Sequence, residues 1–160
     1  PEAVTLDAAL GGKKPLDIIS ITTDDYHATL SRLCSPGTGD IQFVSLGCPH
    51  YTLDEVRQIA WYIRGKRVHP DVLMLVNVDV AIKAMCDLSG YTAAIEEAGA
   101  YVVTSGCALA YGRECFSHAS AMAVDSSKQV QYLGSETNMP IYYGNKFKCI
   151  DAAVSGRWEA

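Results

Sequence analysis

The fold of this chain is decided by residues 41–63, which read IQFVSLGCPHYTLDEVRQIAWYI. The stretch opens with a short apolar run at residues 41–46, which has the length and composition of a buried strand. After a glycine turn, a helix carries apolar residues at the i, i+3, i+4 and i+7 spacing of one stripe. Thr52 and Glu55 predict a capping box at its start. A buried strand followed directly by an amphipathic helix is one unit of an α/β fold.

The same alternation recurs along the rest of the chain. Further strand candidates, each followed by a helical stretch, occur at residues 72–78, 100–104, 121–124 and 141–143. An earlier apolar run at residues 16–21 also precedes helix-start residues. Strands that alternate with helices require right-handed crossovers and a parallel sheet. We therefore expect residues 1–160 to form a single three-layer αβα domain, with a mostly parallel five- or six-stranded sheet and helices on both faces.

Composition excludes several classes of protein. The 160 residues carry a formal net charge of −5, with basic residues scattered along the chain. This argues against a nucleic-acid or anionic-membrane partner, because both select clustered Lys and Arg. No apolar run approaches the roughly 20 residues that a bilayer span needs, and no secretory leader opens the chain. We expect a cytoplasmic protein, and the start at Pro1 without Met suggests part of a longer one.

Functional residues are expected in the loops that follow the strands. In a parallel sheet the carboxyl ends of the strands meet at one edge, and ligands bind there. The loops concerned are residues 47–51, 77–80, 104–108 and 124–128. No GxGxxG follows a strand and no Gly-Lys-Ser/Thr follows the Gly-rich stretch at 35–39, so the nucleotide-binding fingerprints are missing.

Three of the six cysteines fall near expected strand ends: Cys48, Cys107 and Cys149. Their thiolates would suit an iron–sulfur cluster with one iron open to substrate, or a three-thiolate zinc site. The alternative for each is packing, because a free cysteine behaves as a small hydrophobe. The remaining cysteines are interpreted as packing residues: Cys34, Cys86 and Cys115.

Other candidates lie in the same loops. His50 could bind a metal, carry a proton, orient a ligand or simply bond the backbone. Ser126 and Lys128 could hold an anionic substrate at a helix N-terminus, or could cap and solvate that helix. A reactive Cys48–His50 pair is a further option, although two residues so close in sequence on a proline loop rarely reach attack geometry.

Taken together, several stretches resemble the C-terminal part of the large chain of aconitase X, a branch of the aconitase superfamily. They are PEA at 1–3, TLDAALGG at 5–12, FVSLGCPHYTLDE at 43–55 and KCIDAAVSGRW at 148–158, with Ala94, Ala98, Gly99, Val102 and Val103 between them. The match covers nearly the whole chain in the right order and spacing. It is specific as a set, although each piece alone is weak.

The resemblance implies part of a hydro-lyase that acts on a small hydroxy acid, similar to cis-3-hydroxyproline or phosphomevalonate. It implies an iron–sulfur cluster ([2Fe-2S], [3Fe-4S] or [4Fe-4S]) as Lewis acid, with Cys107, Cys149 and Cys48 as ligands here and His50 as the catalytic relay. It also implies two partners, the N-terminal region of the large chain and a small swivelling domain or subunit that brings the base.

The chain departs from the family pattern at the expected substrate loops. Val78, Asp79 and Val80 stand where the family usually shows Thr-Ser-Arg, so the arginine clamp for a substrate carboxylate is replaced by valine, and Asp79 at this expected substrate-binding loop would repel a carboxylate. Lys128 is the alternative clamp, and Asp125 stands where the family shows asparagine. These changes leave a second hypothesis open, namely a diverged, non-catalytic α/β module that binds the remaining parts of the enzyme.

Overall fold

The computed structural model describes residues 2–160, which divide into two units, one ending at Leu30 and one running from Ser31 to Ala160. The second unit is built on a five-stranded sheet in the order β4-β3-β2-β5-β6, and every neighbouring pair is parallel. Its strands are β2 (Phe43–Tyr51), β3 (Leu73–Val78), β4 (Tyr101–Thr104), β5 (Met122–Val124) and β6 (Ile141–Tyr143).

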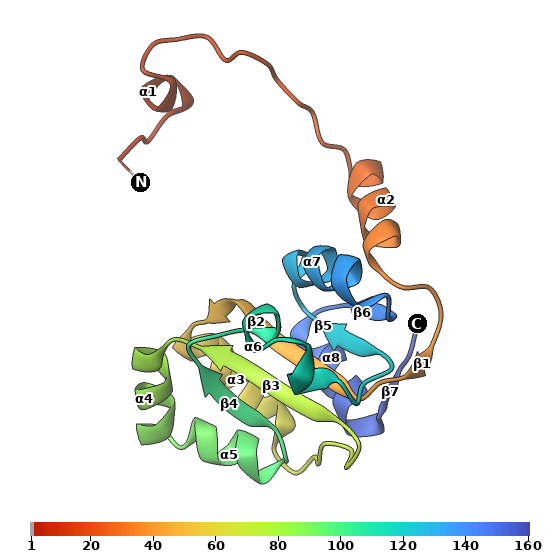
Figure 1. Ribbon diagram of the computed structural model, residues 1–160. Helices are drawn as coiled ribbons and strands as arrows, with labels where there is room; N and C mark the ends of the chain where they lie inside the picture. Colours follow the sequence, from red (N-terminus) through yellow and green to blue (C-terminus); the bar gives the residue numbers. More distant parts are fainter. Residues whose placement is uncertain (1) are drawn as a thin grey trace. The chain divides into compact units, whose positions relative to one another are not determined.

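Helices cover both faces of this sheet (Figure 1). One face packs against α3 (Leu53–Ile63), α4 (Val80–Leu88), α5 (Tyr91–Glu97) and α8 (Lys146–Ser155). The other packs against α6 (Ala108–Tyr111), the 3₁₀ helix η1 (Arg113–Phe116) and α7 (Ser127–Thr137). The predicted three-layer fold with a parallel sheet is therefore confirmed, and the sheet has five strands.

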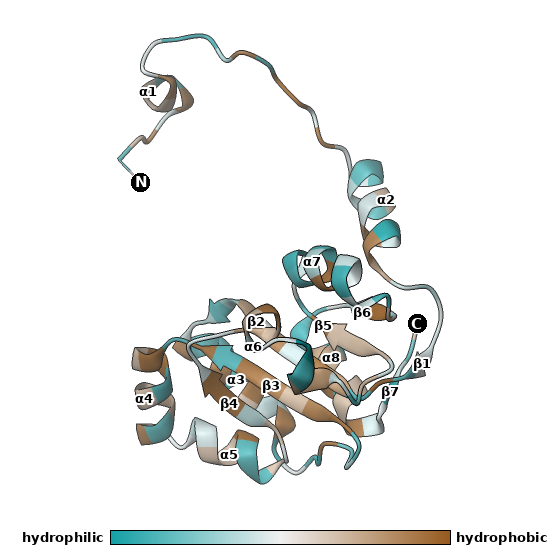
Figure 2. Ribbon diagram, viewed as in Figure 1, coloured by the Kyte–Doolittle hydropathy of each residue, from teal (hydrophilic) through white to brown (hydrophobic). Residues whose placement is uncertain are grey.

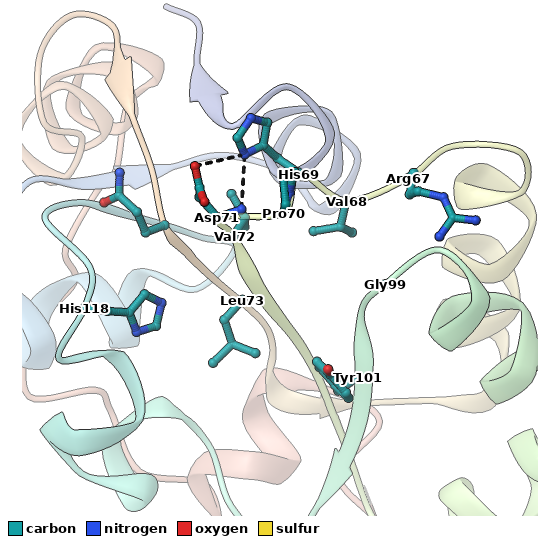
Figure 3. Close-up of a pocket in the computed structure, with 11 residues that line it drawn as sticks. Arg67, Val68, His69, Pro70, Asp71, Val72, Leu73, Gly99, Tyr101 and His118 are labelled. Carbon is teal, nitrogen blue, oxygen red and sulfur yellow. Dashed lines mark hydrogen bonds and ion pairs between the residues drawn. The ribbon is translucent and has the colours of Figure 1, made fainter.

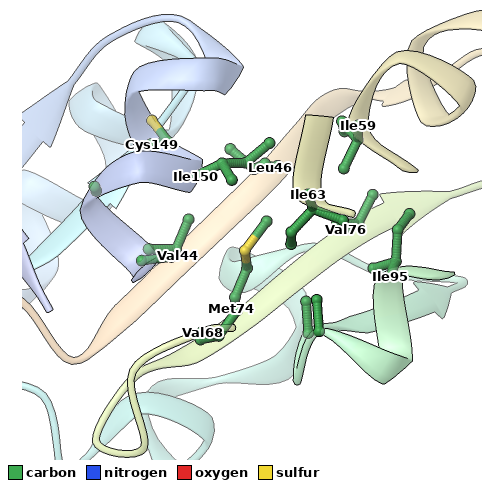
Figure 4. Packing of buried hydrophobic residues seen from close by; sticks show 14 of the residues in the cluster. Val44, Leu46, Ile59, Ile63, Val68, Met74, Val76, Ile95, Cys149 and Ile150 are labelled. Atoms are coloured by element: carbon green, nitrogen blue, oxygen red, sulfur yellow. The ribbon is translucent and has the colours of Figure 1, made fainter. Parts of the chain in front are cut away.

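Alternate residues of each strand supply two separate cores. On β2, Phe43 packs toward α7 and η1, while Val44 and Leu46 pack toward α3 and α8. Successive side chains of a strand point to opposite faces, so one central strand serves both layers. Figure 4 shows the larger core, where Ile59 and Ile63 of α3 meet the strands. Figure 2 shows that the central strands are largely apolar, whereas the helices carry both polar and apolar residues.

The predicted capping box at the start of α3 is present. The Thr52 amide donates to Glu55 Oε2 at 2.9 Å, and the Glu55 amide donates to Thr52 Oγ1 at 3.4 Å. A small antiparallel pair, β1 (Gly39–Asp40) with β7 (Arg157–Trp158), lies outside the main sheet. None of the helices in residues 2–160 is long and apolar enough to cross a membrane.

The first unit contains α1 (Leu6–Leu10) and leads into α2 (Thr23–Leu33). The apolar run at residues 16–21, which the sequence suggested as the start of a strand–helix unit, forms no strand within the described chain. The αβα fold itself lies within the unit that begins at Ser31.

Candidate functional site

The strand order contains one topological switch point. β2 comes first along the chain and lies in the middle of the sheet; β3 and β4 extend to one side of it, and β5 and β6 to the other. The connections that leave β2 and β5 therefore run in opposite directions. Ligands of open α/β sheets bind in the crevice that this divergence leaves outside the carboxyl ends.

A cavity of about 310 Å³ occupies this position. Cys48 and Pro49, which end β2, form one side, and the Cys48–Pro49 peptide bond is cis. The other side is formed by residues 125–128, which connect β5 to α7, and by Tyr143 of β6. We call this cavity the switch-point pocket.

A tyrosine–carboxylate pair joins the switch-point pocket to the core, because half-buried Asp125 lines the pocket and Tyr51 is buried. The Tyr51 hydroxyl donates a short hydrogen bond to Asp125 Oδ2, and the Gly47 amide donates to Asp125 Oδ1 at 3.2 Å. Burial raises the pKa of Asp125 above its ordinary value, while both hydrogen bonds act in the opposite direction. Burial, followed by the Asp125 charge, also raises the pKa of Tyr51. Asp125 thus ties the loop after β2 to the loop after β5.

Ser126 and Lys128 are placed as the sequence predicted, at the start of α7. Ser126 is buried, and its hydroxyl accepts from the Gln129 amide at 3.3 Å as the N-cap of the helix. Lys128 is exposed in the first helical turn, and both residues line the switch-point pocket. The amides of a helix N-terminus beside a lysine favour an anion.

The loop after β4 carries Cys107 and lies against the loop after β2. The Nε2 atom of His50 is 2.9 Å from the Gly106 carbonyl oxygen, so the exposed imidazole bonds the backbone. Ser105 adopts a left-handed conformation with φ of 64°, a strained state for a residue other than glycine. Cys107 is half-buried at the N-cap position of α6.

A buried polar network lies directly beneath these loops. Asn77 donates to Ser45 Oγ at 3.3 Å and to the Leu46 carbonyl at 2.6 Å, and its Oδ1 accepts from the Tyr111 hydroxyl at 3.1 Å. Gln129 donates to Ser45 Oγ at 2.9 Å from the opposite side. Since Ser45, Asn77 and Gln129 are fully buried, these bonds fix the carboxyl ends of β2 and β3 relative to α6 and α7.

The structure treats the three candidate metal ligands differently. Cys48 lines the switch-point pocket and Cys107 is half-buried one loop away, whereas Cys149 is fully buried in α8, as Figure 4 shows. Burial and the Asp125 charge raise the pKa of Cys149, and its sulfur lies 3.7 Å from the Gly144 carbonyl. Within residues 2–160, no three His, Cys, Asp or Glu side chains group closely enough to hold a metal ion.

Asp79, the remaining predicted substrate residue, caps a helix. Its carboxylate accepts from the Ala81 amide at 2.8 Å at the start of α4. This bond gives the carboxylate a structural role at the start of α4. The sequence analysis did not identify Tyr51 and Asp125 as a pair. The pairing could have been predicted from one feature of the sequence, namely a tyrosine near the end of one strand and a carboxylate just after another.

A larger hollow, about 850 Å³, lies at the opposite end of the sheet (Figure 3). Leu73 and Tyr101, which begin β3 and β4, line it together with His69, Asp71 and His118. His69 Nδ1 lies 3.9 Å from the Asp71 carboxylate. Because strands begin here, this hollow lies away from the edge where ligands of such sheets bind.

Comparisons with known proteins agree on one family. The model of the aconitase X third domain matches residues 41–155. A cis-3-hydroxy-L-proline dehydratase of Pseudomonas aeruginosa is 27% identical over 158 residues, which is 98% of this chain and 27% of that protein. A phosphomevalonate dehydratase large subunit of Methanocaldococcus jannaschii is 31% identical over 142 residues, covering 89% of this chain and 33% of that protein.

A solved structure shares the fold. The crystal structure of Thermococcus kodakaraensis aconitase X (holo-form) superposes with a TM-score of 0.74 at 24% identity, over 88% of this chain and 35% of that one. The chain thus spans about a quarter to a third of the length of the relatives it matches.

Proposed function

This chain belongs to the aconitase X third-domain family, and from that membership we propose that it is part of a hydro-lyase acting on a small hydroxy acid. The observation that carries the proposal is the switch-point pocket. Within it, Lys128 and the amides at the start of α7 can hold an anionic group of the substrate, next to the Asp125 carboxyl and the Cys48 thiol. Substrates related to cis-3-hydroxyproline or phosphomevalonate carry such anionic groups.

In this proposal, the residues of the chain bind and orient the substrate. Lys128 pairs with a carboxylate or phosphate, and Ser126 holds the helix start at which that group is bound. Asp125 and Tyr51 fix the backbone at Gly47, which sets the position of the Cys48 loop. His50 holds the neighbouring loop through Gly106, so we assign it the role of fixing the position of Cys107.

The proposed iron–sulfur cluster fits the cysteines only in part. Cys48 near the end of β2 and Cys107 after β4 are partly accessible, whereas Cys149 is buried and its pKa is raised, so its thiolate is disfavoured. We propose that Cys48 and Cys107 are ligands and that other parts of the enzyme supply the rest. When bound, the cluster would provide a Lewis acid for the leaving hydroxyl.

Iron and acid-labile sulfide analysis of the whole enzyme tests this proposal. After anaerobic reconstitution, we expect stoichiometric iron and sulfide, together with dehydration of a hydroxy acid. Cys107→Ser should lose both iron and activity. Cys115→Ala is the matched control, because Cys115 is half-buried away from the pocket and should keep both.

The opposite result would favour the second hypothesis. A folded, complete enzyme that binds no iron, with Cys107→Ser changing only its stability, would indicate a diverged module that binds its partners without chemistry. The observation that supports this alternative is that Asp79, in the loop where a cationic clamp was expected, caps a helix instead.

A further inference from the structure

The segment of residues 16–21, LDIISI, exposes an unusual amount of apolar surface. Leu16 is fully exposed, and Ile18, Ile19 and Ile21 are 79%, 82% and 80% exposed. Figure 2 shows this apolar stretch immediately before α2. Four large aliphatic side chains in six residues rarely remain in water, because their burial is a main driving force of folding.

The order of these side chains predicts a strand that is covered on both sides. In an extended chain, Leu16 and Ile18 would point to one face, and Ile19 and Ile21 to the other. Antiparallel strands with one solvent-exposed face alternate apolar and polar residues. Strands buried inside parallel sheets are apolar on both faces. The segment therefore has the pattern of a sheet strand between two layers of helices.

The residues that follow repeat the strand–helix signature found at residues 41–63. The Thr22 amide donates to Asp25 Oδ2 at 2.9 Å, and the Asp25 amide donates to Thr22 Oγ1 at 3.2 Å. This reciprocal pair starts α2, whose residues are all at least partly exposed. The segment thus leads into a capped helix, as β2 leads into α3, but it belongs to neither of the sheets described within residues 2–160.

The comparisons with known proteins show that the segment lies outside the matched third domain. The third-domain model begins at residue 41, yet the alignment to the Pseudomonas dehydratase covers 98% of this chain and only 27% of that protein. Residues 16–21 are therefore shared with the relatives but fall before the third domain. A neighbouring part of the same enzyme is the one partner that every such relative possesses.

We propose that residues 16–21 form a strand in the β-sheet of another domain of the whole enzyme. Their backbone amides and carbonyls pair with an edge of that sheet, and α2 packs on its face as the returning helix. The segment joins two domains by strand addition. The inference rests on family membership alone and is independent of the proposed dehydratase activity.

Hydrogen exchange in the whole enzyme tests the proposal. Amides of residues 16–21 should exchange at least about 100-fold more slowly than those of the glycine turn at residues 11–14, because sheet pairing protects them. Exchange as fast as in that turn would overturn the inference. Protection that disappears on dilution, together with halving of the mass, would assign the segment to a second copy of the chain and would also overturn it.

Two variants of Ile19 test whether its side chain is buried when the strand forms. Ile19→Asp places a charge on one buried face of the strand, so protection of residues 16–21 should be lost in the whole enzyme. Ile19→Val keeps an aliphatic, β-branched side chain and should retain it. If Ile19→Asp prevents folding, the wild-type exchange pattern still decides the question.

Discussion

Each end of the sheet has a cavity, and the two cavities differ in volume and in the polar groups around them. The hollow at the amino ends of the strands is larger, about 850 Å³ against about 310 Å³ for the switch-point pocket. Yet in the smaller pocket the half-buried Asp125 accepts from buried Tyr51, and a buried hydrogen-bond network lies nearby. The larger hollow is lined by a mixture of buried apolar residues, such as Val68 and Val72, and exposed residues, such as His118. Buried polar groups that are held in place identify the site better than volume does.

The largest effect is expected at Gly47, where the backbone of β2 lies close against the backbone of β3. Gly47 has φ of +87°, and a Cβ atom there would lie 2.4 Å from the Asn77 carbonyl oxygen. We expect Gly47→Ala to lower the free energy of unfolding by about 3 kcal/mol or more, through backbone strain and overpacking. Thermal unfolding of the whole enzyme measures this.

Gly65→Ala is the matched control for that variant. Gly65 has φ of +75°, but a Cβ atom there would meet nothing within 4 Å. Only the conformational cost remains, about 1–2 kcal/mol. Equal losses for the two variants would contradict the view that the strand end at Gly47 is fixed by Asn77.

The next effect concerns the substrate. Lys128→Ala should raise KM roughly tenfold to a hundredfold, because a charge-assisted hydrogen bond to an anion contributes about 1.5–3 kcal/mol. Steady-state kinetics of the whole enzyme would show it. Lys83→Ala is the control, since Lys83 pairs with Asp87 on α4 at 2.7 Å and lies outside the pocket. An unchanged KM for Lys128→Ala would remove Lys128 from the site.

A smaller effect is expected from the tyrosine–carboxylate pair. The folded-state pKa of Asp125 is raised, so stability falls as pH rises from the unfolded pKa of about 3.9 through the folded value. Tyr51→Phe removes a hydrogen bond that lowers this pKa, so the decline should extend to higher pH. It should also cost about 1–3 kcal/mol at neutral pH.

Thermal unfolding across a pH series measures the change for Tyr51→Phe. Tyr132→Phe is the control, because Tyr132 is exposed on α7 away from the pocket, and its profile should follow the wild type. A Tyr51→Phe profile that also follows the wild type would show that the Asp125 carboxyl does not depend on this hydroxyl.

The smallest effect is expected at the amino-end hollow. His118 is exposed there, so His118→Ala should change the free energy of unfolding by less than about 0.5 kcal/mol and leave kcat/KM within twofold. A large loss of activity would show that the hollow, rather than the switch-point pocket, takes part in the reaction.

The fold was predictable because its signals are local. The unit at residues 41–63 carries a strand, a helix stripe and a capping box within one continuous stretch, and the structure contains all three, although β2 begins at Phe43 and continues to Tyr51 through the expected loop. The strand at residues 16–21 was suggested by the same local signals. It forms no strand within residues 2–160, because strand formation depends on pairing with another strand as well as on local signals.

The site was less predictable because its geometry depends on which residues meet across the sheet. The sequence analysis identified Ser126 and Lys128 from their place at a helix start, and both line the pocket. It noted Asp125 only as a departure from a pattern. The contact with Tyr51 follows from the pairing of β2 with β5, which no local signal contains. The burial of Cys149 likewise follows from the packing of α8 on the sheet.

The position of β2 also has a consequence for how the chain folds. β2 precedes the other strands of the five-stranded sheet, and it lies at the centre of that sheet. A chain that emerges from the ribosome amino end first therefore presents the middle of its sheet before either edge. Each later strand then joins a side that is already formed, first β3 and β4 and afterwards β5 and β6. The crevice for the ligand closes only when β5 arrives, so the binding site is among the last features of this domain to mature.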